Sequence, residues 1–254
     1  MEKHTKIIAV AGKGGVGKTS IAANMVRVLT ECCPDKKILA IDADPAVGLS
    51  TALGIEVETT IDDIRKSVVA AAQEGDERTA LELLGEARYQ IFDALVEQNG
   101  FSFIAVGRPE AAGCYCKINS YLKAVISILS EQFDYVVIDG EAGIEQINRR
   151  VMEKVSHLFL VTDSSKKGTD VIKTIKTVAD DLVMYDKVGV IVNRLADKAI
   201  IEKMNLGDLK IASGILSDSS LQEFDLLGKN VFFLPEDSSI VEGTKEALKA
   251  LEII

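Results

Sequence analysis

The sequence lacks any run of 18 apolar residues, and its polar first residues are followed directly by a short apolar segment. Neither a membrane-spanning helix nor a signal peptide is therefore expected. Basic residues are also scarce, with 29 lysines and arginines against 39 aspartates and glutamates, so the formal net charge is −10. A protein that binds the phosphate backbone of nucleic acids needs the opposite balance. We therefore expect a cytoplasmic protein that binds neither membranes nor nucleic acid.

Proline and cysteine are rare as well. Only four prolines and no Pro/Gly/Ser-rich linker occur in 254 residues, which favours a single domain over residues 1–254. The content of 47% hydrophobic and 27% charged residues excludes disorder as the main state. The four cysteines form two close pairs, Cys32 with Cys33 and Cys114 with Cys116. In a reducing compartment, such pairs are inert thiols or metal ligands before they are disulfides.

Short apolar segments alternate with helical segments along the chain. The first apolar segment, Lys6–Gly12, has no helical period and ends in glycine, as expected of a strand buried on both faces. A helix is predicted over Thr19–Cys32, and an insert of two or three helices over residues 60–99. The pattern predicts an α/β fold with a doubly wound, mainly parallel sheet flanked by helices. The other predicted strands are Lys37–Ile41, Ser102–Val106, Tyr135–Ile138, Leu158–Thr162, Val188–Val192, Ile211–Ile215 and Val231–Leu234.

A phosphate-binding motif follows the first predicted strand. Residues 12–19 read GKGGVGKT and match G-x-x-x-x-G-K-[ST] at the start of a predicted helix, which is the context that the motif requires. Its glycines let backbone N–H groups turn toward phosphate oxygens, and the helix N-terminus adds positive potential. Lys18 can neutralise the β and γ phosphates, and Thr19 can hold Mg²⁺. The residues predicted to bind ATP or ADP here are Gly12, Lys13, Gly14, Gly15, Val16, Gly17, Lys18, Thr19 and Ser20.

Three carboxylates follow two other predicted strands. Asp42 and Asp44 come after Lys37–Ile41, and Asp139 comes after Tyr135–Ile138. Ligands of open parallel sheets bind at this edge. Because alternate residues of a strand face the same way, Asp42 and Asp44 are both predicted to approach Mg²⁺ or its waters. Asp139 fits the Walker B position, at which a carboxylate meets Mg²⁺ through water.

The nucleotide base is expected near a further strand. Asn193 and Arg194 follow Val188–Val192, and an amide side chain at that edge can both donate to and accept from an adenine. The guanine motif N-K-x-D is not met, because position 194 is arginine. The sequence therefore favours ATP over GTP.

The segment GKGGVGKT resembles the deviant Walker A signature of the class that contains MinD, ParA and the nitrogenase iron protein. Members of this class form dimers that enclose ATP, so the resemblance implies a homodimer in which Lys13 reaches the nucleotide of the second copy. It also implies that Asp42 touches the metal shell and that Asp44 orients the attacking water. Lys13, Lys18 and Asp44 are thus the implied catalytic residues of a Mg²⁺-dependent ATPase.

Two further segments are similar to this class. Residues 139–143 read DGEAG and resemble its switch II segment, D-x-x-A-G. Pro235, Glu236 and Asp237 lie in the segment that closes on the base in the resembling proteins, which implies that they contact the adenine.

The pair Cys114 and Cys116 lies in the sequence Gly-Cys-Tyr-Cys, before a helix that is predicted to start near Ile118. Two thiolates fill only two of the four positions that Zn²⁺, square-planar Ni²⁺ or an iron–sulfur cluster requires. A twofold dimer would supply the other two. The alternative is that these thiols are small apolar fillers, which is the interpretation that we prefer for Cys32 and Cys33.

The phosphate motif, the D-A-D-P segment and the G-C-Y-C segment together resemble the CooC-type nickel-insertion ATPases, over nearly the whole chain. The resemblance implies a metallochaperone that inserts Ni²⁺ into a client metalloenzyme such as carbon monoxide dehydrogenase, with Ni²⁺ or Zn²⁺ shared across the dimer. An iron–sulfur scaffold or carrier that uses the same thiolates remains the alternative. An electron-donating iron protein is disfavoured because no cysteine follows Gly143.

Overall fold

The computed structural model describes residues 5–44, 48–73, 77–107, 116–140, 147–148, 151, 154–182 and 185–254. Within these residues, eight strands form one sheet in the order β3-β4-β2-β5-β1-β6-β7-β8. All neighbouring strands are parallel except β3 and β4. The predicted doubly wound parallel sheet is confirmed. The strands are β1 (Lys6–Gly12), β2 (Ile38–Asp42), β3 (Val96–Gln98), β4 (Phe101–Ala105), β5 (Tyr135–Asp139), β6 (His157–Thr162), β7 (Lys187–Leu195) and β8 (Ile211–Leu216).

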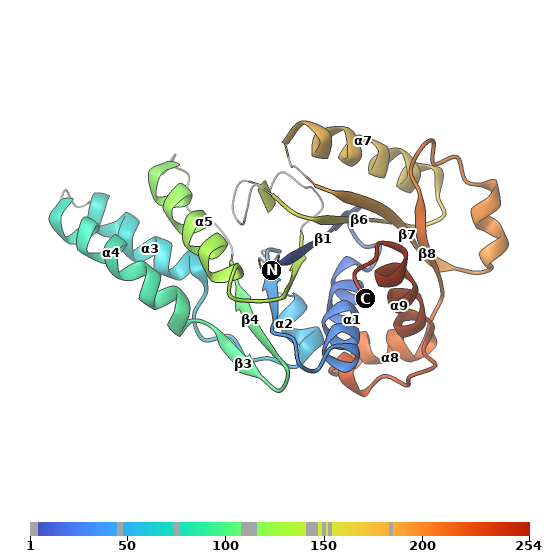
Figure 1. The fold of residues 1–254 in the computed structure, drawn as a ribbon, viewed down its shortest axis with the longest axis horizontal. Helices are drawn as coiled ribbons and strands as arrows, with labels where there is room; N and C mark the ends of the chain where they lie inside the picture. The colour runs from blue at the N-terminus through green and yellow to red at the C-terminus, as the bar shows by residue number, and fades with distance from the viewer. Residues whose placement is uncertain are drawn as a thin grey trace.

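Helices cover both faces of the sheet, because the central strands are apolar on both sides. In β1, Ile8 and Val10 face one core while Ala9 and Ala11 face the other. Helices α1, α2 and α9 pack on the first face, and α3, α4, α5 and α7 pack on the second (Figure 1). The helices are α1 (Lys18–Cys32), α2 (Gly48–Leu53), α3 (Ile61–Gln73), α4 (Glu77–Asp93), α5 (Cys116–Ser130), α7 (Lys166–Leu182), α8 (Ser219–Leu227) and α9 (Ser239–Ala250), with 3₁₀ turns η1 (Lys198–Lys203) and η2 (Val231–Phe233).

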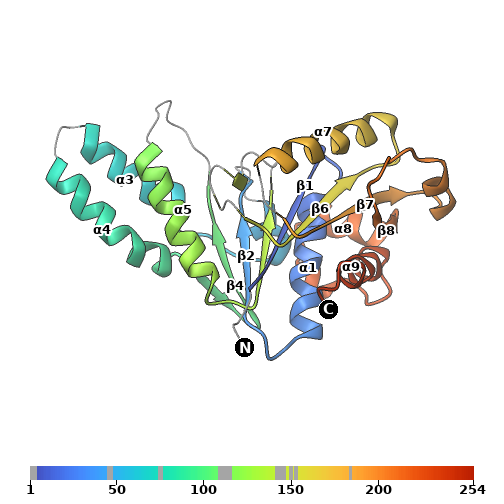
Figure 2. The same ribbon diagram turned by 45° about the horizontal axis from the view of Figure 1, so that its top comes forward.

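The predicted helical insert at 60–99 contains α3 and α4, which pack against each other and extend past α5 (Figures 1 and 2). The expectation that it holds no strand is wrong. Residues Val96–Gln98 form the short edge strand β3, antiparallel to β4. Its exposed Glu97 and Gln98 give no apolar alternation from which a strand could be predicted.

The predicted strand at Val231–Leu234 is also wrong. This segment forms the 3₁₀ turn η2, and the buried Arg27 side chain of α1 donates from Nη1 to the carbonyls of Val231 and Leu234, at 3.0 and 2.9 Å. The Asn230 side chain accepts a hydrogen bond from the amide of Phe232 at 2.9 Å. Side chains therefore satisfy the backbone groups that a neighbouring strand would otherwise pair.

Candidate functional site

The phosphate motif forms the turn between β1 and α1. Gly17 precedes α1 with φ of 89°, a left-handed conformation that favours glycine, and a Cβ there would lie 2.7 Å from the Nδ2 atom of Asn193. No acidic residue lies in the first turn of α1, so its free N–H groups keep their positive potential. A cavity of about 420 Å³ opens at this turn. It is lined by Gly14, Gly15, Gly17, Lys18, Thr19, Asp44 and Arg194.

Two acidic residues lie side by side at the end of adjacent strands. Asp42 is the last residue of β2 and pairs in register with Asp139, the last residue of β5. Both residues are fully buried. Neither oxygen of Asp139 makes a hydrogen bond of ordinary geometry to a described residue. A buried carboxylate without a partner is costly, unless a cation or a proton joins it.

Burial raises the pKa of both carboxyl groups. The pKa of Asp139 rises to about 7, mainly through loss of hydration and also through the neighbouring charge of Asp42, while Thr19 and Lys18 act to lower it. The pKa of Asp42 rises to about 6 for the same main reason, although the amides of Leu49 and Asp44 oppose the rise. A divalent cation would favour the ionised forms, so the pair fits Mg²⁺ with its oxygen ligands.

Asp42 and Asp44 differ from the predicted arrangement. Strand β2 ends at Asp42, so the alternation of a strand does not extend to Asp44. The Asp42 carboxylate instead accepts hydrogen bonds from the backbone amides of Asp44 and Leu49, at 3.1 and 2.9 Å. Asp44 lines the cavity. The structure therefore brings Asp44 to the phosphate site, while Asp42 also binds the backbone of Leu49 in the first turn of α2.

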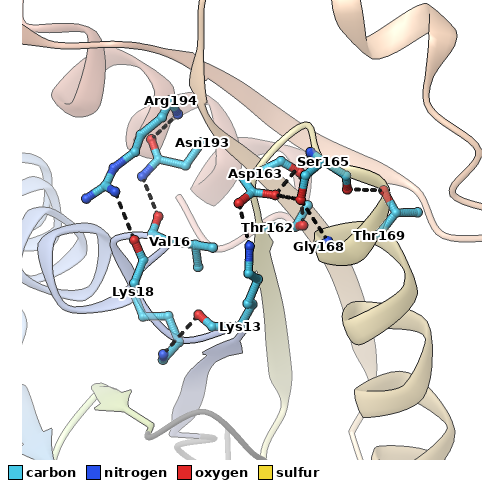
Figure 3. A network of polar contacts seen from close by, with 11 residues as sticks. Lys13, Val16, Lys18, Thr162, Asp163, Ser165, Gly168, Thr169, Asn193 and Arg194 are labelled. Carbon is cyan, nitrogen blue, oxygen red and sulfur yellow. Dashed lines mark hydrogen bonds and ion pairs between the residues drawn. The ribbon is translucent and has the colours of Figure 1, made fainter.

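The two lysines of the motif lie in different directions. Lys18 is largely buried, and its Nζ lies 3.4 Å from the carbonyl oxygen of Lys13 at the cavity. Lys13 points instead toward the end of β6, where its Nζ donates to Oδ2 of Asp163 at 2.8 Å (Figure 3). Sequence reasoning missed Asp163. Its one signal was an acid directly after a buried strand, the same signal that marked Asp42 and Asp139.

Asn193 and Arg194 do not follow β7 but lie inside it, at a bulge. Val192 pairs with Gly214 and Leu195 with Leu216, so β7 has one residue more than β8 between these pairs. Arg194 takes a left-handed backbone with φ of 58°. The bulge directs Asn193 Nδ2 to the carbonyl of Val16 at 2.9 Å, and Arg194 Nη1 to that of Gly15 at 2.9 Å (Figure 3).

These hydrogen bonds use polar groups of Asn193 that were predicted to bind the nucleotide base. The Asn193 amide also accepts a hydrogen bond from the backbone of Arg194 at 2.9 Å, so its oxygen and one N–H serve the chain itself. Recognition of adenine by Asn193 stays a prediction. Pro235, Glu236 and Asp237 form an exposed turn before α9. They are not among the residues that line the cavity, and contact with the base stays a prediction for them too.

Asp218 holds that turn in place, and sequence reasoning missed it. It caps α8 by accepting from the Leu221 amide at 3.0 Å, and it also accepts from the Ser238 hydroxyl and, at 3.2 Å, the Ile240 amide. One carboxylate therefore joins the starts of α8 and α9. Although burial raises the pKa of Asp218, these hydrogen bonds outweigh it and keep the pKa below its usual value. Its signal was again an acid after a strand, here β8.

The cysteines divide into two groups. Cys114 and the side chain of Cys116 lie outside what the structure describes, as do residues 141–143 of the predicted switch II, so the metal hypothesis is not tested. No group of three or more metal-binding side chains occurs among the described residues. Cys33 is half-buried, with Sγ 3.8 Å from the Tyr135 hydroxyl, but Cys32 at the end of α1 is exposed. The interpretation of Cys32 as an apolar filler is therefore wrong, because its helix position faces solvent.

A parallel sheet, a glycine turn with two lysines and buried acids at the strand ends together define a P-loop ATPase. Residues 7–245 match the family described as the CobQ/CobB/MinD/ParA nucleotide binding domain, and the chain belongs to that family. As a member of this family, it binds and hydrolyses ATP.

Three proteins illustrate the similarity. An uncharacterized ATP-binding protein of Methanocaldococcus jannaschii is 34% identical over 245 residues, which cover 94% of this chain and 96% of that protein. The carbon monoxide dehydrogenase accessory protein CooC of Rhodospirillum rubrum is 28% identical over 255 residues, 97% of this chain and 89% of CooC. The septum site-determining protein MinD of Pyrococcus horikoshii, solved in complex with Mg-ADP, has the same fold with a TM-score of 0.68 at 20% identity, covering 98% of this chain and 96% of that one.

None of the helices in the described residues has the length and apolar character needed to cross a membrane.

Proposed function

We propose that this protein is an ATP-hydrolysing metallochaperone that forms a homodimer with ATP and inserts nickel into a metalloenzyme such as carbon monoxide dehydrogenase. Cys114 and Cys116 of each protomer hold the ion between them. The observation that carries the proposal is the combination of this C-x-C pair with similarity to CooC along 97% of the chain. Two thiolates per copy leave a soft ion half coordinated, so a dimer completes the site.

The nucleotide site supplies the ATPase part of this proposal. The N–H groups of the glycine turn and the ammonium of Lys18 hold the triphosphate, because both lie at the cavity. Thr19, Asp42 and Asp139 hold Mg²⁺ and its waters, and Mg²⁺ supplies neutralisation of the phosphate charge. Asp44, which also lines the cavity, orients the attacking water. In the dimer, Lys13 donates to the triphosphate of the second copy.

The apolar residues of α9 and of the segment after it are packed in the fold, which distinguishes them from a free membrane-binding face. A membrane anchor would be a basic amphipathic segment with a free apolar face. Here Ile253 is buried, and its carbonyl accepts hydrogen bonds from Lys6 Nζ at 2.9 Å and from the Tyr135 hydroxyl at 3.3 Å. The apolar face of α9 is already packed on the sheet, so these residues are used by the fold.

Metal analysis of the full chain, purified without oxygen, tests the proposal. The protein is loaded with Ni²⁺ in the presence of Mg²⁺ and a non-hydrolysable ATP analogue, and nickel per protomer is measured after gel filtration. We expect one ion per dimer for the wild type. Cys114→Ser and Cys116→Ser should each lose the ion and keep nucleotide binding, because the P-loop is unchanged. The double variant Cys32→Ser/Cys33→Ser is the matched control and should keep the ion.

Two outcomes would overturn nickel handling. One is unchanged nickel in both Cys114→Ser and Cys116→Ser. The other is a brown protein with absorbance near 400 nm that contains iron and inorganic sulfide in place of nickel, which would establish the iron–sulfur carrier instead.

A further inference from the structure

The side chain of Lys13 is held away from the nucleotide cavity of its own chain. Lys18, Thr19 and three of the motif glycines line that cavity, and Lys13 does not. Figure 3 shows Lys13 extended to Asp163, with Nζ and Oδ2 2.8 Å apart. The two side chains are 27% and 32% exposed, so water reaches the pair but does not surround it. Asp163 is thus a definite partner for a lysine that does not line the cavity of its own chain.

Asp163 is a fixed acceptor rather than a loop charge that happens to lie nearby. Its Oδ1 accepts hydrogen bonds from the backbone amide of Ser165, at 3.1 Å, and from the Ser165 hydroxyl. The same hydroxyl accepts from the amide of Gly168 at 3.0 Å, within the first turn of α7. Ser165 therefore caps α7 and orients Asp163 at the same time, which leaves Oδ2 directed at Lys13.

The first turn of α7 leaves room for this carboxylate only because residue 168 is glycine. A Cβ on Gly168 would lie 2.3 Å from Oδ1 of Asp163 and 2.5 Å from Oγ1 of Thr162. Burial alone would raise the pKa of Asp163, but the bonds from Lys13 and Ser165 outweigh it and hold the pKa below its usual range. Asp163 is therefore ionised at neutral pH and opposes the positive charge of Lys13.

We propose that Asp163 is a positioning residue that retains Lys13 in its own protomer, and that this ion pair opens when Lys13 moves to the triphosphate of a second copy. The inference rests on the proposed ATP-bound dimer. An ion pair as exposed as this one shifts an equilibrium by only about 1.5- to 5-fold. A triphosphate carries several negative charges, so it competes with one carboxylate for the ammonium. The strength of the Lys13–Asp163 pair therefore affects the ATP concentration at which the protein dimerises.

Asp163→Asn in the full chain tests the proposal. Asparagine keeps an oxygen for the Ser165 amide, but its side chain carries no charge for Lys13. Light scattering during titration with Mg²⁺ and a non-hydrolysable ATP analogue gives the nucleotide concentration at half-maximal dimerisation. We expect that concentration to fall about 2- to 5-fold relative to the wild type. An unchanged or higher concentration would overturn the proposal.

Two companion variants identify the cause. Lys13→Ala/Asp163→Asn should behave as Lys13→Ala does, since Asp163 acts through Lys13; a gain from Asp163→Asn without Lys13 would contradict this. Asp180→Asn is the matched control. It breaks another Lys–Asp pair of α7, in which Lys176 Nζ lies 2.6 Å from Asp180, and it should leave the ATP requirement unchanged. An equal gain in this control would assign the effect to general loss of negative charge.

The proposed function and this inference fail in different ways. If Lys13→Ala dimerises like the wild type, the ATP-bound dimer with Lys13 acting on the second copy is wrong. If Lys13→Ala fails to dimerise while Asp163→Asn matches the wild type, only the role of Asp163 is wrong. Should Asp163→Asn not fold, Asp163→Ser replaces it, because a hydroxyl can still accept from the Ser165 amide but carries no charge for Lys13. It should lower the required ATP concentration in the same direction.

Discussion

Polar groups at the two edges of the sheet differ in burial and in hydrogen bonding. At the carboxyl edge, Asp42 and Asp139 are buried with raised pKa values, and Asp139 has no hydrogen bond of ordinary geometry to a described residue. At the amino edge, Lys6 donates to the carbonyls of Glu252 and Ile253 at 3.1 and 2.9 Å. There, the Lys6 ammonium binds the backbone of the last described residues to strand β1.

This difference separates stability from binding. Groups at the amino edge satisfy backbone acceptors and so favour the folded state. At the carboxyl edge, Asp139 is buried without a hydrogen bond of ordinary geometry to a described residue, which costs stability and prepares that edge for a charged ligand. Substitutions at the two edges should therefore have opposite effects, and the following predictions test this from the largest effect to the smallest.

The largest effect is expected for Lys18→Ala at the carboxyl edge. Its ammonium is the lysine charge at the cavity, so ATP hydrolysis should fall on the order of 10²- to 10³-fold. Because the hydrogen bond of Lys18 Nζ to the described residues is a long one of 3.4 Å, the midpoint of urea unfolding should change little. Phosphate release and urea titration measure the two quantities. Retained hydrolysis would remove Lys18 from its assigned role.

Asp139→Asn should change stability and ATP hydrolysis in opposite directions. The nucleotide-free variant should be more stable than the wild type at pH 8, by on the order of 1–3 kcal/mol, because a buried charge without a partner is removed. Its Mg²⁺-dependent hydrolysis should nevertheless be lost. Urea unfolding and phosphate release check both expectations. A variant less stable than the wild type at pH 8 would contradict the contrast between the edges.

The pH dependence of stability follows from the same carboxyl group. The folded pKa of Asp139 is about 7, above the value of 3.8 expected without burial, so between these values the folded chain holds a proton that the unfolded chain has lost. Unfolding then releases protons, and this group lowers stability as pH rises from about 4 to 7, with no further change above that range. The free energy of unfolding, measured at pH 5 and pH 8, should show a smaller decrease in Asp139→Asn than in the wild type.

At the amino edge, Lys6→Met should cost about 1 kcal/mol of stability by removing two hydrogen bonds to backbone carbonyls. ATP hydrolysis should be unchanged, since Lys6 begins β1 at the end opposite the phosphate turn. Thermal unfolding and phosphate release are the measurements. A fall in ATP hydrolysis with stability unchanged would contradict the assignment of the amino edge to stability.

The smallest effect is expected away from both edges. Lys198 Nζ lies 3.5 Å from Glu246, and both side chains are 55% exposed. Lys198→Ala should change stability by less than about 0.5 kcal/mol, because water screens such pairs. A larger loss of stability in a urea titration would mean that exposed ion pairs also stabilise this protein. The loss measured for Lys6→Met would then not be specific to the amino edge.

The sequence predicted the central part of the fold and the position of the glycine turn. Buried strands such as β1 and the glycine turn after it are recognisable because their signals are local: uninterrupted apolar residues and a fixed spacing of glycine and lysine. The misses lie where local signals were weak or misleading. Strand β3 is short and polar, and the apolar segment at Val231–Leu234 is held in a 3₁₀ turn by Arg27, which lies 204 residues away from Val231 in the chain.

Within the site, the sequence identified Asp44 and Lys18 as cavity residues but not how neighbouring groups are used. The bulge that turns Asn193 and Arg194 onto the phosphate turn arises from a register shift between β7 and β8. Asp218 joins α8 to α9 through contacts up to 22 residues apart. Such arrangements depend on how finished elements pack, and no single segment carries that information.

The amino-acid sequence by itself determined that this chain forms a parallel sheet with a phosphate-binding turn and acids at the strand ends, because strand burial and glycine spacing act between near neighbours. Only the tertiary structure decided which lysine faces the cavity, that Lys13 is paired with Asp163 across 150 residues of chain, and that Asp139 holds its proton up to a pH of about 7. The physical reason is that side-chain pairing and the hydration of a charge depend on what surrounds each group after the chain has folded.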